Sequence, residues 1–173
     1  PWAMAGWQLN GLGKNGKQIN LSNKPLGAFK NLKKLSVIDD GNLYTTIECF
    51  YDLDTISLRK EYKIYHNSID VDVAINLFYN DSDSIIKLEV PAVKGNKYIG
   101  QTAYGTEELF TDGKENVSHR FVANVYDDKC LAIINDCTFG NAYCDGTIKI
   151  DLLRGAGYCT HPIGDRMLCP DRY

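Results

Sequence analysis

Paired carboxylates are the residues of this 173-residue chain whose type and spacing come closest to a catalytic arrangement. A glycoside-cleaving site needs two carboxyl groups, one acting as acid or base and the other as base or nucleophile. The candidate pairs are Asp39-Asp40, Asp70 with Asp72, Glu107-Glu108 and Asp127-Asp128. Three pairs are adjacent residues interpreted as turns, where Asp supports turn hydrogen bonding. Asp70 and Asp72 share the outer face of a predicted strand, so all four pairs are interpreted as turn or surface residues.

Other catalytic signatures are missing from the sequence. There is no G-x-S-x-G element, no phosphate-binding loop and no nucleophile beside a clear base. None of the six cysteines forms a C-x-x-C pair, and the three histidines share no ligand spacing with them, so no metal site is predicted in this chain. A chain of this length does not need disulfides, and reduced, mostly buried thiols and a cytoplasmic location are expected.

Two neighbouring segments near the C-terminus end in polar residues. The apolar run Leu131–Ile134 leads into Asn135 and Asp136, and the alternating stretch that follows ends at Arg154. The rim loops of β-sandwiches commonly bind ligands, which makes these three polar residues candidates for a binding site. In the structural alternative, Asn135 and Asp136 cap a turn and Arg154 forms an ion pair with Asp136 or Asp151. The residues alone leave both interpretations open.

The elements that must position these residues are strands. From residue 43 onward, period-two alternation predicts about eight strands separated by Asp-Gly turns. The residues predicted to face inward are clearest in two of them: Val71, Val73, Ile75 and Leu77, and Ile86, Leu88 and Val90. No window shows helical periodicity. Alternation with polar outer faces is typical of antiparallel sheets, so an all-β antiparallel sandwich is predicted.

Residues 1–35 differ in composition from the rest. They are rich in Gly, Asn and Lys, and we expect a loop-rich, Lys-bearing segment that Trp2, Trp7 and Phe29 pin onto a single sandwich of residues 36–173. An aromatic side chain in this segment could alternatively stack on a sugar. The chain begins with Pro rather than Met, and we expect it to be an excerpt of a longer polypeptide.

The charge distribution argues against a nucleic-acid partner. Residues 1–38 hold six lysines and no acid, and all 22 acidic residues follow them. A basic arm can bind nucleic acid, but this one has no arginine and the acidic remainder would repel a polyanion. No apolar stretch approaches the ~18 residues that cross a bilayer, so no membrane contact is expected. No secretory signal is visible in residues 1–30.

The C-terminal part of the sequence resembles a known enzyme family. The stretch RFVANVYDDKCLAIINDCTFGNAYCDGTIKIDLLRGAGY is similar to the C-terminal β region of family-38 glycoside hydrolases, the retaining α-mannosidases. The family's motifs are matched in order and spacing by His119–Val122, Leu131–Gly140 and Asp145–Arg154. A weaker similarity extends the match to Ser36–Tyr158. The family's lysine and tyrosine are replaced by Thr138 and Phe139, and its proline after L-L-R is absent.

The resemblance implies a supersandwich of the galactose-mutarotase-like type and a parent glycosidase of mannose metabolism. In the family, an N-terminal barrel holds a zinc ion and an Asp nucleophile. This chain would pack on that barrel, line its cleft with Arg154, Asp136 and Asn135, and be inactive alone. The implied partners are the barrel and other domains of the same polypeptide and an α-mannoside oligosaccharide; a homo-oligomer is also considered. The alternatives are an independent carbohydrate-binding sandwich that uses exposed aromatics, and a purely structural domain.

Overall fold

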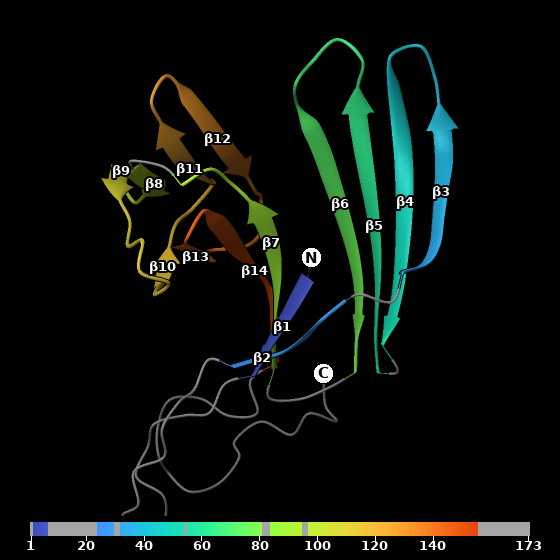
Figure 1. Cartoon of the computed structure of the whole chain (residues 1–173), viewed down its shortest axis with the longest axis horizontal. Coiled ribbons are helices and arrows are strands. Elements are labelled where there is room, and N and C mark those ends of the chain that lie inside the picture. The colour runs from blue at the N-terminus through green and yellow to red at the C-terminus, as the bar shows by residue number, and fades with distance from the viewer. Residues whose placement is uncertain are drawn as a thin grey trace, which may run out of the picture. The chain divides into compact units, whose positions relative to one another are not determined.

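The structure is a computed structural model that describes residues 2–6, 24–29, 32–53, 55–80, 84–94 and 97–155. All regular secondary structure in these residues is β-strand, which confirms the all-β class. The strands, labelled as in Figure 1, are β1 (Trp2–Gly6), β2 (Lys24–Ala28), β3 (Leu32–Asp40), β4 (Tyr44–Leu53), β5 (Ile56–Tyr65), β6 (Val71–Tyr79), β7 (Ser84–Pro91), β8 (Lys97–Thr102), β9 (Gly105–Glu108), β10 (Glu115–Val117), β11 (Phe121–Tyr126), β12 (Lys129–Ile134), β13 (Gly140–Cys144) and β14 (Thr147–Gly155). The described residues include no helix long and apolar enough to cross a membrane.

The chain forms two compact units. Unit 1 consists of Pro1–Gly27 and Asp83–Tyr173, and unit 2 of Ala28–Ser82. Unit 1 contains a six-stranded sheet in the order β10-β13-β14-β7-β1-β2 and a four-stranded sheet in the order β12-β11-β8-β9. Unit 2 is the four-stranded meander β3-β4-β5-β6, whose long strands stand side by side in Figure 1. All strand pairs whose register is described are antiparallel, as predicted.

The core of unit 1 joins its two sheets into a sandwich. Strands of both sheets contribute to a cluster of buried side chains: Tyr98, Val122, Tyr143, Ile148 and Ile150. The rings of Tyr98 and Tyr143 stack with centroids 5.1 Å apart. The Tyr98 hydroxyl donates to Asn141 Oδ1 at 2.8 Å, so these two buried polar groups satisfy each other. Burial disfavours the phenolate and raises the pKa of Tyr98.

The predicted inward-facing residues have two different outcomes. In β7, Ile86 is fully buried and Leu88 and Val90 pack against the core of unit 1, as the alternation predicted. In β6, Val71 and Val73 are 49% and 41% exposed, so their predicted burial is wrong. The alternation was identified correctly, because the register places them on one face. The neighbouring strand β5 contributes residues to the same face. These β5 residues are buried near the start of the strand and more exposed toward its end, where they face Val71 and Val73.

The opposite face of unit 2 is polar and carries a chain of ion pairs. Glu48 accepts Lys34 Nζ at 3.3 Å and Arg59 Nε at 2.7 Å. Arg59 also contacts Glu61 at 2.7 Å through its Nη2. The hydrogen bond from Lys34, with help from the Arg59 charge, lowers the pKa of Glu48. This sheet is therefore amphipathic, as the sequence predicted.

The N-terminal segment contains strands where loop was predicted. β1 pairs along β7, and β2 lies beside β1 at the edge of the six-stranded sheet. Trp7 lies outside the described residues, as does the Trp2 side chain. Phe29 is buried, but its ring packs edge-on against Tyr51 within unit 2 at 6.5 Å. The predicted division at residue 35 does not coincide with the boundaries of the two units, and the domain limits in a longer parent stay a prediction.

The cysteines were predicted to be reduced and mostly buried. The four that the structure describes are free thiols: Cys49, Cys130, Cys137 and Cys144. Only Cys49 among them is buried, and two are exposed, so the prediction of burial was wrong. Cys159 and Cys169 lie outside the described residues.

Candidate functional site

The predicted rim residues lie at one end of the unit 1 sandwich. In the four-stranded sheet, Ile134 at the end of β12 faces Phe121 at the start of β11. Asn135 follows, and its amide donates to the Arg120 carbonyl at 2.8 Å. The turn that ends β8 reaches the same end of the sheet, because Gly100 faces Val122.

The six-stranded sheet contributes the end of β14. The connection from residue 135 to residue 139 leads into β13, and β14 runs antiparallel to β13. The last residues of β14, including Arg154, therefore lie at the end of the sandwich where this connection lies. The Ser118 amide donates to the Phe139 carbonyl at 2.9 Å. This hydrogen bond joins the connection between β10 and β11 to the connection between β12 and β13. We call this part of unit 1 the Arg154 end.

Asn135 and Asp136 occupy different environments within it. Asn135 Oδ1 accepts a hydrogen bond from the Thr138 amide at 3.2 Å, which is the turn-capping role of the structural alternative. Asp136 is exposed, and its hydrogen bond with the neighbouring thiol is the main cause that raises the pKa of Cys137. Neither residue forms a hydrogen bond or ion pair with Arg154, and the structural alternative describes Asn135 better than Asp136.

A β-bulge decides the direction of Arg154. Ile150 of β14 faces Leu88 and Asp151 faces Lys87, but the register then shifts by one residue. Arg154 consequently faces Ile85, on the side of the sheet away from the core. Without the extra residue, strict alternation would place Arg154 on the core side with Ile150.

Arg154 is exposed at this position and takes part in no ion pair or hydrogen bond with the described residues. The ion pairs with Asp136 and Asp151 that the sequence left open do not form, because Asp151 contacts Lys87 instead. Period-two alternation alone does not predict the bulge. Its signal was the consecutive pair Leu152-Leu153, which interrupts the alternation of apolar and polar residues.

A buried charge cluster lies immediately before the bulge. The side chain of Lys87 is 4% exposed and contacts Asp151 Oδ1 at 2.8 Å and Glu115 Oε1. The contact with Asp151 is an ion pair without hydrogen-bond geometry, since Asp151 Oδ1 has no hydrogen-bond partner. Burial raises the pKa of Glu115, while the hydrogen bond from Lys87 acts in the opposite direction. Alternation alone had predicted that Lys87 faces solvent.

Small residues make room for this cluster. Lys87 lies on β7 and Glu115 on β10, with β14 and β13 between them in the sheet order. On β13, Gly140 and Ala142 are on the same side of the sheet as the cluster. A Cβ at Gly140 would lie 2.9 Å from Asp151 Cγ and closer still to its Oδ2. Asp151 can therefore occupy its observed position only because residue 140 has no side chain.

The acidic pairs do not form a catalytic arrangement. Asp39-Asp40 and Glu107-Glu108 end strands β3 and β9, so the turn interpretation was wrong for both, and neighbouring side chains in a strand point to opposite faces. Asp127-Asp128 does form a turn, with Asp127 at φ 49°. The remaining pair is exposed: Asp70 accepts from Ser68, and Asp72 accepts from the Tyr65 hydroxyl, both at 2.6 Å.

Within the part of the chain that the structure describes, no three His, Cys, Asp or Glu side chains are grouped to hold a metal ion. These residues therefore do not fit the zinc ion that the family resemblance implies for a parent enzyme.

Comparison with known proteins supports the family resemblance. A search of curated proteins found no match. The sequence profile described as "Glycosyl hydrolases family 38 C-terminal domain" matches residues 7–171. This range includes every strand from β2 onward, and with it the Arg154 end. Because the match covers nearly the whole chain, the chain belongs to glycosyl hydrolase family 38 and corresponds to its C-terminal domain.

Proposed function

We propose that this chain is the sandwich region of a retaining α-mannosidase and that its Arg154 end lines the cleft of a catalytic barrel elsewhere in the parent polypeptide. Family membership implies a glycosidase parent. The observation that carries the finer proposal is the exposed Arg154 guanidinium, which the bulge turns away from the core and which has no partner among the described residues.

An exposed arginine in this position is suited to holding a sugar. Its guanidinium presents five N–H donors in a fixed plane, and each can donate to a hydroxyl oxygen. Asp136, also exposed, can accept from a hydroxyl. In this proposal the zinc ion and the nucleophile belong to the barrel, and the share of this chain is to bind and orient the substrate. The chain alone is then expected not to hydrolyse an aryl α-mannoside, with or without added zinc.

The test uses the full-length parent and two measurements on each variant, turnover and thermal midpoint. Arg154→Ala is expected to lower kcat/KM by roughly one to two decades, because a hydrogen bond to a charged group contributes about 1.5–3 kcal/mol. Its thermal midpoint is expected to change little, since no described partner is lost. Arg154→Lys keeps the charge without the planar donor set and is expected to recover part of the loss.

Arg59→Ala is the matched control. This arginine is about half exposed but pairs with Glu48 and Glu61, so its loss is expected to affect stability and not turnover. Unchanged turnover in Arg154→Ala with a large fall in the midpoint would make Arg154 a structural residue. α-Mannosidase activity from the 173-residue chain alone would also contradict the proposal.

A further inference from the structure

The most exposed of the large hydrophobic residues described in unit 1 is at the tip of the β8–β9 hairpin. Tyr104 has a relative exposure of 110%. It is the second residue of a two-residue turn, because Thr102 pairs with Gly105 across the hairpin. Its ring has no ring contact and its hydroxyl no hydrogen bond with the described residues. Its only described hydrogen bond is from its backbone amide to the Thr102 carbonyl at 3.1 Å.

The backbone at this residue is unfavourable for a tyrosine. Tyr104 has φ 145°, in a region that residues with a side chain rarely adopt and that glycine adopts at little cost. Folding thus tolerates a strained conformation here, while the exposed ring contributes no packing in return. Strained residues of this kind concentrate at ligand-binding sites, where function offsets the cost.

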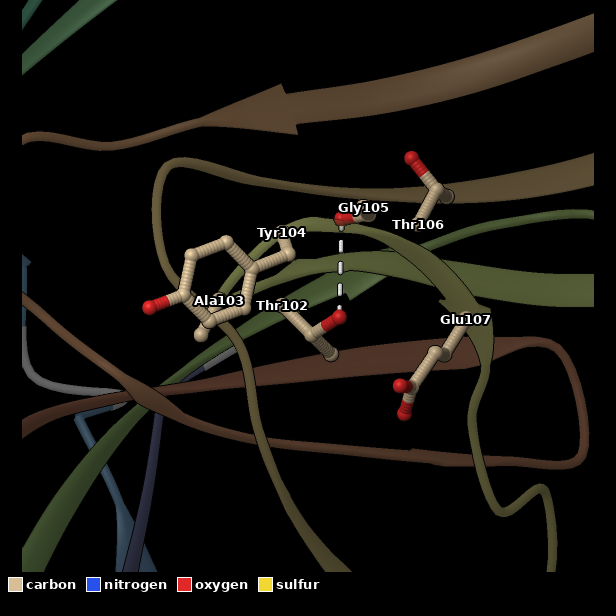
Figure 2. Close-up of a pocket in the computed structure, with 6 residues that line it drawn as sticks. All are labelled: Thr102, Ala103, Tyr104, Gly105, Thr106 and Glu107. Carbon is tan, nitrogen blue, oxygen red and sulfur yellow. Dashed lines mark hydrogen bonds between the residues drawn. The ribbon is translucent and has the colours of Figure 1, made fainter.

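A hollow of about 330 Å³ lies beside the ring, lined by residues 102–107. The register places Thr102 and Glu107 on the same face of the hairpin as Gly105. A Cβ at Gly105 would meet nothing within 4 Å, so this face is open at that residue. Figure 2 shows the Tyr104 ring at the turn, the Thr102 side chain at the end of the strand before it, and the Glu107 side chain on the strand after it.

The chemistry of this hollow fits one ring of a neutral sugar. An aromatic face stacks on the apolar face of a pyranose, while a carboxylate and a hydroxyl bond to the sugar hydroxyls. Glu107 and its neighbour Glu108 disfavour phosphates and other anions. The volume lies at the lower end of the range for small-molecule sites, which suits one sugar unit and not a large ligand.

We propose that the β8–β9 hairpin is a binding site for a neutral sugar ring, with Tyr104 as the stacking surface and Glu107 as the hydroxyl acceptor. The choice of a sugar as the ligand rests on the proposed function. The hairpin lies at the Arg154 end of unit 1, since Gly100 faces Val122 and the turn extends beyond it.

The test is a titration of the ¹⁵N-labelled 173-residue chain with an α-linked mannotriose, followed by amide chemical shifts. We expect shifts centred on Gly105 and Thr106, with a Kd on the order of 1 mM. Tyr104→Gly is expected to weaken binding at least tenfold while leaving the thermal midpoint unchanged or raised, because it removes the strain and no packing. Glu107→Gln is expected to weaken binding by about threefold, since an amide oxygen accepts less strongly than a carboxylate.

Phe110→Ala is the matched control, because Phe110 is an exposed aromatic outside the hollow and its loss is expected to leave the Kd unchanged. Three results would overturn the inference: no shifts at the hairpin, a Kd unaffected by Tyr104→Gly, or a lower midpoint in Tyr104→Gly. The proposed function is tested by the turnover of the parent protein, and the sugar site is tested by binding to the 173-residue chain. Either proposal can therefore fail while the other stands.

Discussion

Replacement of Gly140 by alanine tests whether the charge cluster of β7, β10 and β14 depends on a missing side chain. The new Cβ would lie 2.9 Å from Asp151 Cγ and 3.2 Å from Asp151 Cβ. A real Cβ atom does not approach another carbon at 2.9 Å, so the short Asp151 side chain or the β13 backbone must move. Movement of Asp151 separates it from Lys87, whose ammonium group is almost completely buried.

The expected loss of stability is about 2–3 kcal/mol. Overpacking a well-packed site typically costs about 1–3 kcal/mol. Removing one partner of a buried ion pair costs about 3–5 kcal/mol, but Lys87 keeps its contact with Glu115, so only part of that applies. The lower entropy of the unfolded alanine chain offsets about 0.4–1 kcal/mol. Taken together, these effects favour a clear loss in the range given.

Urea denaturation of the 173-residue chain measures this change, with Gly105→Ala as the control. A Cβ at Gly105 meets nothing within 4 Å, so that variant is expected to be as stable as the wild type or up to about 1 kcal/mol more stable. In an Asp151→Ala background, Gly140→Ala should cost much less, because Asp151 Cγ and Oδ2 are gone and only the Cβ at 3.2 Å remains. A Gly140→Ala variant that unfolds within about 0.5 kcal/mol of the wild type would refute the steric argument.

Three further predictions follow from burial and charge. Val73→Asp is expected to lower the free energy of unfolding by less than about 1 kcal/mol, because Val73 is 41% exposed. Ile148→Ala in the unit 1 core should lower it by about 2–5 kcal/mol, and urea denaturation measures both changes. Burial raises the pKa of Glu115, so the stabilisation from its protonated form is complete below pH 4.5 and is lost as the pH rises through the raised pKa. The wild type should therefore lose stability relative to Glu115→Gln as the pH rises above 4.5, and the opposite trend in urea denaturation would contradict this. The hydrogen bond to the Asp136 carboxylate raises the pKa of Cys137, so Asp136→Asn should speed the alkylation of Cys137 by a neutral maleimide. Peptide mass spectrometry measures the rate, and an unchanged rate would count against the hydrogen bond.

Period-two alternation predicted the fold class because it reports which residues share a face of a strand. It placed Ile86 correctly, and it also grouped Val71 and Val73 correctly on one face of β6. Alternation does not report what covers that face, which explains why the burial of these two valines was wrong. Burial depends on whether another sheet or segment packs on that face, and the alternation within one strand gives no information about this packing.

The site could be predicted only where neighbouring residues decide the geometry. The capping role of Asn135 depends on a residue three positions later, and the sequence offered it as one of two alternatives. The cluster of Lys87, Glu115 and Asp151 depends on three strands of one sheet, β7, β10 and β14, and β13 separates β10 from the other two. The pattern within one strand gives no information about which strands the sheet brings together. Short strands such as β9 and β10, of four and three residues, were missed because alternation needs a longer window.

The position of the buried charges suggests why this sheet holds them. Replacing a buried ion pair by apolar residues is often neutral or stabilising, so stability alone is a weak reason for Lys87 to contact Asp151. Asp151 is the last residue in regular register before the bulge, and its partner fixes which residue of β7 it faces. A one-residue slip would exchange the two faces of the strand and return Arg154 to the core side. We infer that the ion pair specifies this register, which makes the Gly140→Ala variant informative twice: its unfolding reports the packing of Asp151, and its turnover in the parent reports whether Arg154 still points away from the core.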